Sequence, residues 1–197
     1  MVIPRGWTNA DAVAAMREFF AQRSPRRAAI RELMKELLSE SPFDRRCAAD
    51  LARRVSEREP GILKEYAGVL IDLAAQLPLD QWQARGYVTL AATRNASTHA
   101  ERMRLATPVR VMLDDERIAL RAIALEAFAV LAAAEPELRE EAMLLLERCR
   151  RNGTCAERSR ARRMLLLLLK AENEAGAKRS AAGLDDYRSA MASGRPH

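Results

Sequence analysis

An internal repeat is the feature of this sequence that most constrains its fold. A Glu-Pro dipeptide at residues 59–60 recurs at residues 135–136, and the same shift aligns Arg45 with Arg121. Arg85 lies near the position expected for a copy between them, so the period is about 38 residues. A repeat of this length accommodates two helices of ordinary length and two tight turns. The sequence therefore predicts a stack of antiparallel helix pairs.

Helical periodicity, interrupted by short breakers, divides most of the chain into a series of expected helices. We place them at residues 9–22, 26–39, 44–58, 62–77, 80–95, 98–113, 115–134, 137–151 and 155–170. Asp44 and Thr154 are predicted N-caps of two of these helices. Hydrophobic residues make up 49% of the chain and aromatic residues only 5%, with alanine and leucine dominant, which favours helix packing over a sheet. The predicted fold class is all-α.

The last part of the chain differs in composition from the rest. Residues beyond 172 are mostly small or polar, and large apolar side chains are almost absent. Such a segment buries too little surface to offset the entropy that it loses on ordering. We therefore expect a single helical domain over residues 1–172, which begins with a flanking helix. A flexible tail is expected over residues 173–197, with a short helix around residues 184–192.

The repeat unit carries a recognisable residue pattern. The copy at residues 115–134 has an Asp at its start, a Leu-Arg pair at 120–121 and an alanine one turn later, and the copy at residues 80–95 repeats part of this pattern. This arrangement resembles a HEAT-type helical repeat over roughly residues 26–170. The resemblance implies a right-handed α-α superhelix, a HEAT-like repeat solenoid of about four helix pairs. It also implies that four residues form hydrogen-bonded ladders between repeats and are structural: Asp80, Arg85, Asp115 and Arg121.

The charge of the chain suggests an anionic partner but does not define one. The formal charge is +6 and the sequence pI is about 9.7. Only four of the 33 basic residues are lysines, a bias that genome base composition can produce, and the sign of the charge alternates along the chain. In the densest basic cluster, residues 148–163, several arginines oppose a helix dipole, which an anion or solvent would compensate. Anion-binding candidates are Arg158 and Arg160 there, with Arg102 and Arg110 in a second patch; the alternative is a solvated capping face.

Enzyme chemistry finds little support in the sequence. His99 is the only internal histidine, so neither an HExxH motif nor a His-Glu or His-Cys cluster can form a catalytic metal site. The glycines are scattered and form no phosphate-binding loop, and there is no GxSxG motif. We therefore predict a protein that is not an enzyme, with no catalytic, cofactor-binding or metal-binding residues and no cofactor.

The cysteines and the apolar segments favour a cytoplasmic location. Cys47, Cys149 and Cys155 form no CxxC pair and leave an odd thiol, which argues against a secreted disulfide framework. The first residues lack the charged and apolar regions of a secretory signal. The longest run of large apolar side chains, residues 164–169, is far shorter than the ~20 residues of a membrane helix. We expect no membrane association.

The function predicted from these observations is a non-catalytic scaffold that binds a protein partner. The concave surface would be formed by the second helix of each pair, at residues 44–58, 80–95, 115–134 and 155–170, and its mixed charge favours a protein over a nucleic acid. The residues expected to be exposed there are Arg46, Asp50, Arg53, Thr89, Arg94, Ala122, Glu126, Ala129, Arg162 and Arg163.

Two other functions remain open at this point. The first is a nucleic-acid-binding HEAT-like repeat protein, such as a DNA-repair glycosylase-like protein. Asp80, Trp82 and Arg85 weakly resemble the Asp, Trp and Arg that some helical-repeat DNA glycosylases use in a concave groove. This alternative predicts that the basic residues at 85, 94, 102, 110 and 158–163 converge on one face. The second is a homo-oligomer, in which an alanine-rich helix face or an uncapped terminal repeat is buried between copies.

Overall fold

The computed structural model describes residues 7–21 and 26–192, and it describes side chains for all of these except Arg26 and residues 175–192. All regular secondary structure in these residues is helical, which confirms the predicted all-α class. The helices are α1 (Asn9–Ala21), α2 (Arg26–Leu37), α3 (Pro42–Arg58), α4 (Ala67–Gln76), α5 (Trp82–Asn95), α6 (His99–Leu113), α7 (Ile118–Ala134), α8 (Arg139–Asn152) and α9 (Cys155–Ala192). Short 3-10 turns, η1 (Lys64–Tyr66), η2 (Leu79–Gln81) and η3 (Pro136–Leu138), precede α4, α5 and α8.

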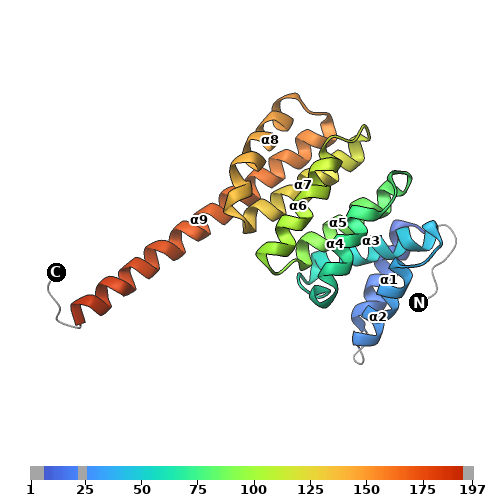
Figure 1. The fold of residues 1–197 in the computed structure, drawn as a ribbon, viewed down its shortest axis with the longest axis horizontal. Coiled ribbons are helices and arrows are strands. Elements are labelled where there is room, and N and C mark those ends of the chain that lie inside the picture. The colour runs from blue at the N-terminus through green and yellow to red at the C-terminus, as the bar shows by residue number, and fades with distance from the viewer. Residues whose placement is uncertain (1–6, 22–25, 193–197) are drawn as a thin grey trace.

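The helices form pairs that stack side by side (Figure 1). Helices α2 and α3, α4 and α5, α6 and α7, and α8 and α9 pack against each other as consecutive pairs. The second helices α3, α5, α7 and α9 also contact one another in series, and we call them the second-helix layer. The first helices α2, α4, α6 and α8 form the first-helix layer, and α1 packs on α3 and α2 at the N-terminal end. The right-handed superhelix stays a prediction.

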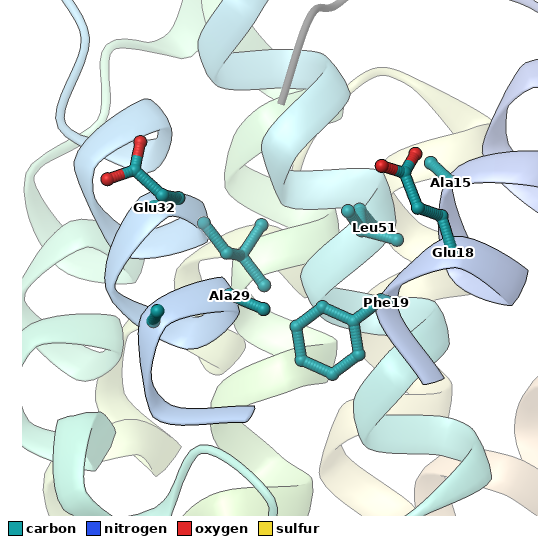
Figure 2. A pocket seen from close by; sticks show the side chains of 8 residues that line it. Ala15, Glu18, Phe19, Ala29, Glu32 and Leu51 are labelled. Carbon is teal, nitrogen blue, oxygen red and sulfur yellow. The ribbon is translucent and has the colours of Figure 1, made fainter. Parts of the chain in front are cut away.

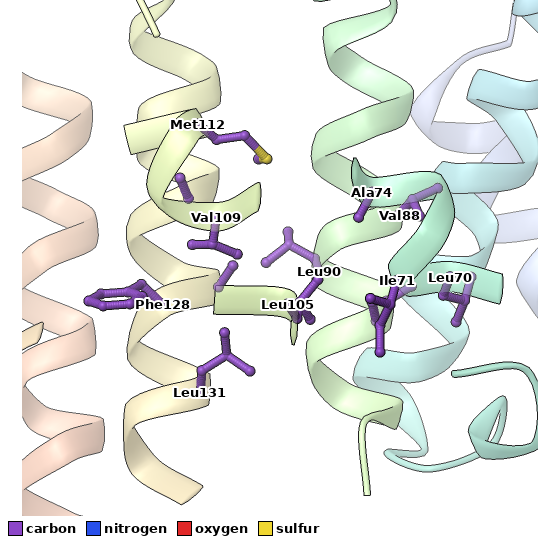
Figure 3. Packing of buried hydrophobic residues seen from close by; sticks show 14 of the residues in the cluster. Leu70, Ile71, Ala74, Val88, Leu90, Leu105, Val109, Met112, Phe128 and Leu131 are labelled. Atoms are coloured by element: carbon purple, nitrogen blue, oxygen red, sulfur yellow. The ribbon is translucent and has the colours of Figure 1, made fainter. Parts of the chain in front are cut away.

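The core lies between the two layers and is filled mainly by leucine and alanine. Figure 3 shows Val109 of α6 and Leu90 of α5 facing each other in the core, with Phe128 of α7 on one side of them and Ile71 of α4 on the other. Five alanines of α7 are almost fully buried: Ala122, Ala124, Ala127, Ala129 and Ala132. Small side chains at these positions let neighbouring helices approach closely. The apolar character of α7 therefore reflects its place in the middle of the stack.

Gly86 marks the closest approach of α5 and α7. A methyl group in place of its hydrogen would lie 3.0 Å from Cδ1 of Ile123 and 3.2 Å from Cδ1 of Leu120. Both of these side chains belong to α7. The absence of a Cβ at Gly86 therefore helps to set the spacing of the second-helix layer.

Polar caps fix the ends of several helices. Thr98 and Glu101 form a capping box at the start of α6. Thr154 is confirmed as the predicted cap of α9, because its hydroxyl accepts a hydrogen bond from the Glu157 amide. The prediction for α3 was wrong: Ser41 is its N-cap, and its hydroxyl accepts from the amide of Asp44, which lies in the first turn.

Helix α9 is longer than the sequence predicted. It continues past residue 170 to Ala192, and its second half projects away from the stacked pairs (Figure 1). The predicted end near residue 170 was wrong because it relied on the loss of large apolar side chains. Alanine, glutamate, lysine and arginine are strong helix formers, and they dominate this segment without an interrupting proline. The last part of the predicted tail, residues 193–197, lies outside the described residues.

None of the described helices combines the length and the apolarity that a bilayer crossing requires.

Candidate functional site

The most organised polar feature of the structure is a chain of ion pairs across the second-helix layer. Glu126 of α7 is only 8% exposed, and each of its carboxylate oxygens accepts from a different neighbour. Arg94 of α5 donates from Nη2 to Oε1 at 2.6 Å, and Arg160 of α9 donates from Nη1 to Oε2. One carboxylate therefore links three consecutive helix pairs.

A second cluster surrounds Asp50 of α3, which is 7% exposed. Arg53 donates from Nη2 to Oδ1 at 2.7 Å, and Arg54 donates from Nε to Oδ2 at 3.0 Å. The indole N–H of Trp7 also donates to Oδ2, at 3.4 Å. Both carboxylate oxygens are thus occupied, and Trp7, which precedes α1, is tied to α3.

The two clusters belong to one electrostatic surface. Burial lowers the pKa of Arg94; Glu57 of α3 raises that pKa and Arg53 lowers it. Burial also lowers the pKa of Arg160. The positive charges of Arg163, Arg53 and Arg94 lower this pKa further, and the negative charge of Glu57 raises it. Charges on α3, α5 and α9 are therefore close enough to influence one another.

We call this surface the second-helix face. We assign to it the six arginines and three carboxylates that contacts and charge interactions connect: Arg46, Arg53, Arg54, Arg94, Arg160 and Arg163, with Asp50, Glu57 and Glu126. The excess of arginines makes the face basic, while the buried carboxylates hold several of the guanidinium groups in fixed positions. Such a face can bind an anionic group without first ordering its own side chains.

A hollow of about 220 Å³ opens at the α1 end of this face. It is lined by Trp7, Thr8, Asn9, Arg46, Asp50, Arg54, Gln83 and Tyr87. Arg46 donates from Nη1 to Oε1 of Gln83 at 3.3 Å, and its guanidinium lies 5.3 Å from the centre of the Phe43 ring. The guanidinium of Arg53 lies 5.3 Å from the centre of the Tyr87 ring. The hollow therefore combines aromatic side chains with cations.

The predicted partner-binding residues are only partly exposed. Arg46, Arg53, Arg94 and Arg163 do contribute to the second-helix face. The prediction that Asp50 and Glu126 are exposed was wrong, because arginines enclose both carboxylates. Thr89, Ala122 and Ala129 are buried as well, since α5 and α7 pack closely against their neighbours.

Arg162 does not face the same way as Arg160. It is exposed, and the two residues that separate it from Arg160 along α9 rotate it by about 200° around the helix axis. The side chain of Arg160 points to Glu126, so Arg162 lies on the opposite side of α9. The predicted exposure of Arg162 is confirmed, while its place on a binding surface stays a prediction.

The predicted anion-binding arginines are not brought together. Arg102 pairs with Glu135 at the start of α6, at 2.5 Å, whereas Arg160 pairs with Glu126. Arg110 of α6 makes a bidentate pair with Glu141 of α8, at 2.9 and 2.6 Å. Arg158 precedes Arg160 by two residues and lies on the other side of α9. These side chains lie in separate places, and three of the four are neutralised by glutamates.

The predicted ladder residues have partners other than those expected. Arg121 donates to the side chain of Glu157 at 2.7 Å and to the backbone oxygen of Asp115 at 2.8 Å. The carboxylate of Asp115 instead accepts from the amide of Arg117, at 2.8 Å. Arg121 therefore bridges α7 and α9 through a glutamate, while the Asp115 carboxylate turns back to its own loop.

The other two predicted ladder residues, Asp80 and Arg85, differ in their exposure. Asp80 is exposed in η2, whereas Arg85 of α5 is only 7% exposed. Arg85 donates from Nε to the backbone oxygen of Ala74 at 3.0 Å. Burial lowers the pKa of Arg85, and the charge of Asp115 partly opposes this. Arg85 therefore joins α5 to the end of α4.

Sequence reasoning missed a recurring arginine bridge. Four arginines donate to the backbone oxygen six residues earlier: Arg45 to Ser39, Arg102 to Ala96, Arg121 to Asp115 and Arg139 to Ala133. Three of them also reach a side chain about one repeat later, namely Gln81, Glu135 and Glu157. The signal was present in the sequence as an arginine followed one period later by Gln or Glu.

Glu157 is the most strongly perturbed member of these bridges. It is 6% exposed, and burial by itself would raise its pKa. Hydrogen bonds from Arg121 and from the hydroxyl and amide of Thr154 outweigh burial and hold the pKa at about 2. Glu157 therefore stays ionised and joins α7 to the start of α9.

Residues with catalytic potential are engaged in structural contacts. Nδ1 of His99 lies 2.7 Å from Oε2 of Glu135, which Arg102 also holds. Burial raises the pKa of both the Cys47 and the Cys149 thiols. Within the described part of the chain, no group of three or more His, Cys, Asp or Glu side chains could hold a metal ion.

A smaller hollow of about 160 Å³ lies between α1, α2 and α3 (Figure 2). Its lining is mostly apolar, with Ala29, Phe19 and Leu51 prominent. Glu18 and Glu32 stand on opposite sides of it in Figure 2, so their carboxylates do not form an acid-base pair. This hollow therefore presents a mostly apolar surface with few polar groups that could orient a ligand.

Comparison with known proteins gives no match: no family model, no curated protein and no solved structure matches this chain. Arguments about function therefore rest on the chain's own residues, and the HEAT-type resemblance stays a prediction.

Proposed function

We propose that this chain is a non-catalytic, HEAT-like binding protein that holds a protein partner on its second-helix face. The observation that carries the proposal is the continuity of that face. Ion pairs join α5, α7 and α9 through Glu126, and electrostatic interactions extend the surface to α3. A partner that contacts all four helices would gain from side chains that are already ordered.

The distribution of charge favours a protein over a nucleic acid. Asp50, Glu57 and Glu126 lie among the arginines of the face, so a regular row of phosphates would meet carboxylates as well as cations. Two of the basic residues that the nucleic-acid alternative requires on this face, Arg102 and Arg110, instead pair with glutamates of other helices or turns. A polypeptide can place acidic, neutral and apolar side chains to suit each position.

A cytoplasmic location is part of this proposal. Cys47, Cys149 and Cys155 are free thiols in the structure, and such thiols persist where the surroundings are reducing.

Site-specific photo-cross-linking in the native host would test the proposed function. A photoreactive residue, p-benzoylphenylalanine, replaces Arg163 on the second-helix face or, as the control, Leu144 on the first-helix layer, which is 67% exposed. We expect protease-sensitive cross-linked products from position 163 and few from position 144. Nuclease-sensitive products would support the nucleic-acid alternative, products between two copies of this chain would support a homo-oligomer, and equal yields at both positions would remove the second-helix face as the site.

A further inference from the structure

The hollow at the α1 end of the second-helix face has a chemistry more specific than the face as a whole. Its only acidic lining residue is Asp50, and both oxygens of that carboxylate already accept two N–H groups each. The acceptor capacity of the hollow is therefore largely used by the protein itself. What remains available to a ligand depends on the other polar side chains.

Two amides in the hollow are oriented as donors. Asn9 accepts from Arg54 through Oδ1 at 2.8 Å, and Gln83 accepts from Arg46 through Oε1 at 3.3 Å. Because each amide oxygen faces a guanidinium group, its NH₂ group points elsewhere, and neither NH₂ has an acceptor among the described residues. The arginines thus convert both amides into hydrogen-bond donors for a ligand.

Arg46 supplies the uncompensated charge. Within the described part of the chain it makes no ion pair, whereas Arg53 and Arg54 both pair with Asp50. Asp80 lines an adjoining hollow on the other side of Arg46, but no oxygen of Asp80 comes within salt-bridge distance. The Phe43 ring packs against the guanidinium at 5.3 Å and limits its movement. A fixed cation therefore stands beside two fixed donors.

We propose that this hollow is a carboxylate-binding subsite, which anchors an acidic side chain of a protein partner that lies across the second-helix face. The inference rests on the proposed function and names the chemistry that the partner presents. A carboxylate accepts up to four hydrogen bonds, and it could receive them from Arg46, Gln83 and Asn9 at once. The aromatic rings of Trp7 and Tyr87 line the same hollow, and they would pack against the carbon atoms of the acidic residue.

A fluorescence anisotropy titration with the full chain tests this subsite. The probe is a short fluorescein-labelled peptide of Glu, Ser and Leu with blocked ends, and the reference peptide has Gln in place of every Glu. We expect the wild type to prefer the acidic peptide and Arg46→Gln to weaken its binding roughly ten-fold, as for one lost charged hydrogen bond. Arg148→Gln, which removes the same charge from the hollow between α6 and α8, should change the affinity less than about two-fold.

Substitutions of Gln83 should change the affinity for the acidic peptide in both directions. Gln83→Lys adds a cation to the hollow and should tighten binding of the acidic peptide, while Gln83→Glu should pair with Arg46 and weaken it. Thermal melting by circular dichroism shows whether each variant is folded. Equal binding of the two peptides by the wild type, or equal effects of Arg46→Gln and Arg148→Gln, would overturn the proposal.

The two proposals can fail separately. Protein cross-links from position 163 together with unchanged peptide affinity in Arg46→Gln would leave the proposed function standing and remove the carboxylate subsite. Tighter binding of a short DNA duplex than of the acidic peptide, with nuclease-sensitive cross-links, would remove both.

Discussion

Glu157 shows how a single buried carboxylate stabilises the contact between two helix pairs. Its Oε1 accepts from Arg121 of α7 at 2.7 Å, and its Oε2 accepts from the amide and the hydroxyl of Thr154, both at 2.7 Å. Removing the charge would leave the Arg121 guanidinium without its carboxylate. We expect Glu157→Gln to lower the free energy of unfolding by about 2–4 kcal/mol, measured by urea titration at neutral pH.

The matched control is Glu141→Gln. Glu141 also pairs with an arginine of another helix, Arg110, but both side chains are more than two-fifths exposed. Exposed pairs contribute at most about 1 kcal/mol, so this variant should stay within that range. Losses of equal size in the two variants would show that burial does not set the strength of these bridges.

The pKa of Glu157 also fixes the sign of a pH dependence. The pKa is about 2 in the folded chain against an ordinary value of 4.5. Because the folded-state pKa is the lower one, the stabilisation is present above 4.5 and is lost as the pH falls towards 2. The difference in stability between wild type and Glu157→Gln should therefore shrink when the urea titration is repeated at about pH 3.

The burial of residues on the second-helix face, like the arginine bridges, was not predicted from the sequence. The sequence placed Asp50 and Glu126 on the correct helices, and helical geometry alone made them look exposed. Their burial comes from arginines on neighbouring helices, such as Arg94 and Arg160, and these cannot be positioned without the packing of one pair on the next. The hollow depends on Trp7, which contacts Asp50 across 43 positions of sequence.

At the scale of elements, the turn between α8 and α9 has little tolerance for added atoms. A Cβ at Gly153 would lie 2.5 Å from the backbone oxygen of Cys149 and 2.9 Å from Cβ of Glu157. We expect Gly153→Ala to lower the free energy of unfolding by roughly 1–3 kcal/mol, because the backbone must shift to relieve the contact. Urea titration or calorimetry would measure the loss.

Gly68 provides the opposite case for the same substitution. It lies in the first turn of α4, and a Cβ there would meet no atom within 4 Å. Alanine is the better helix former, so Gly68→Ala should raise stability by up to about 1 kcal/mol. A change of the same sign in both glycine variants would contradict this account.

Helix boundaries were predictable where the sequence contains clear capping and turn residues. Thr154 and the glycine before it separate α8 from α9 as expected, since a cap and a turn residue act locally. The length of α9 was not predictable from apolar periodicity, because residues 171–192 form a helix without a stripe of large apolar side chains. Intrinsic helix propensity, rather than packing, accounts for that segment.

At the scale of the whole molecule, the repeat noted in the sequence predicted pairs of helices that stack on their neighbours. In the structure, α3 contacts α5, α5 contacts α7 and α7 contacts α9, and among the described residues the first and last pairs share no extensive packing. Stability in such an array is close to a sum of local and nearest-neighbour contributions. Helices with neighbours on both sides should therefore be the most stable.

Hydrogen exchange followed by mass spectrometry tests this arrangement. We expect the slowest exchange in α5 and α7, which lie between two neighbours of their layer, and faster exchange in α1 and α2, which pack mainly on α3. The part of α9 that projects beyond the stacked pairs should exchange fastest (Figure 1). If all the helices from α1 to α8 instead exchanged at one common rate, the molecule would unfold as a single cooperative unit, and a nearest-neighbour array would be the wrong description. A graded pattern would also explain why single buried bridges such as Arg121 with Glu157 matter, since each joins one pair to the next.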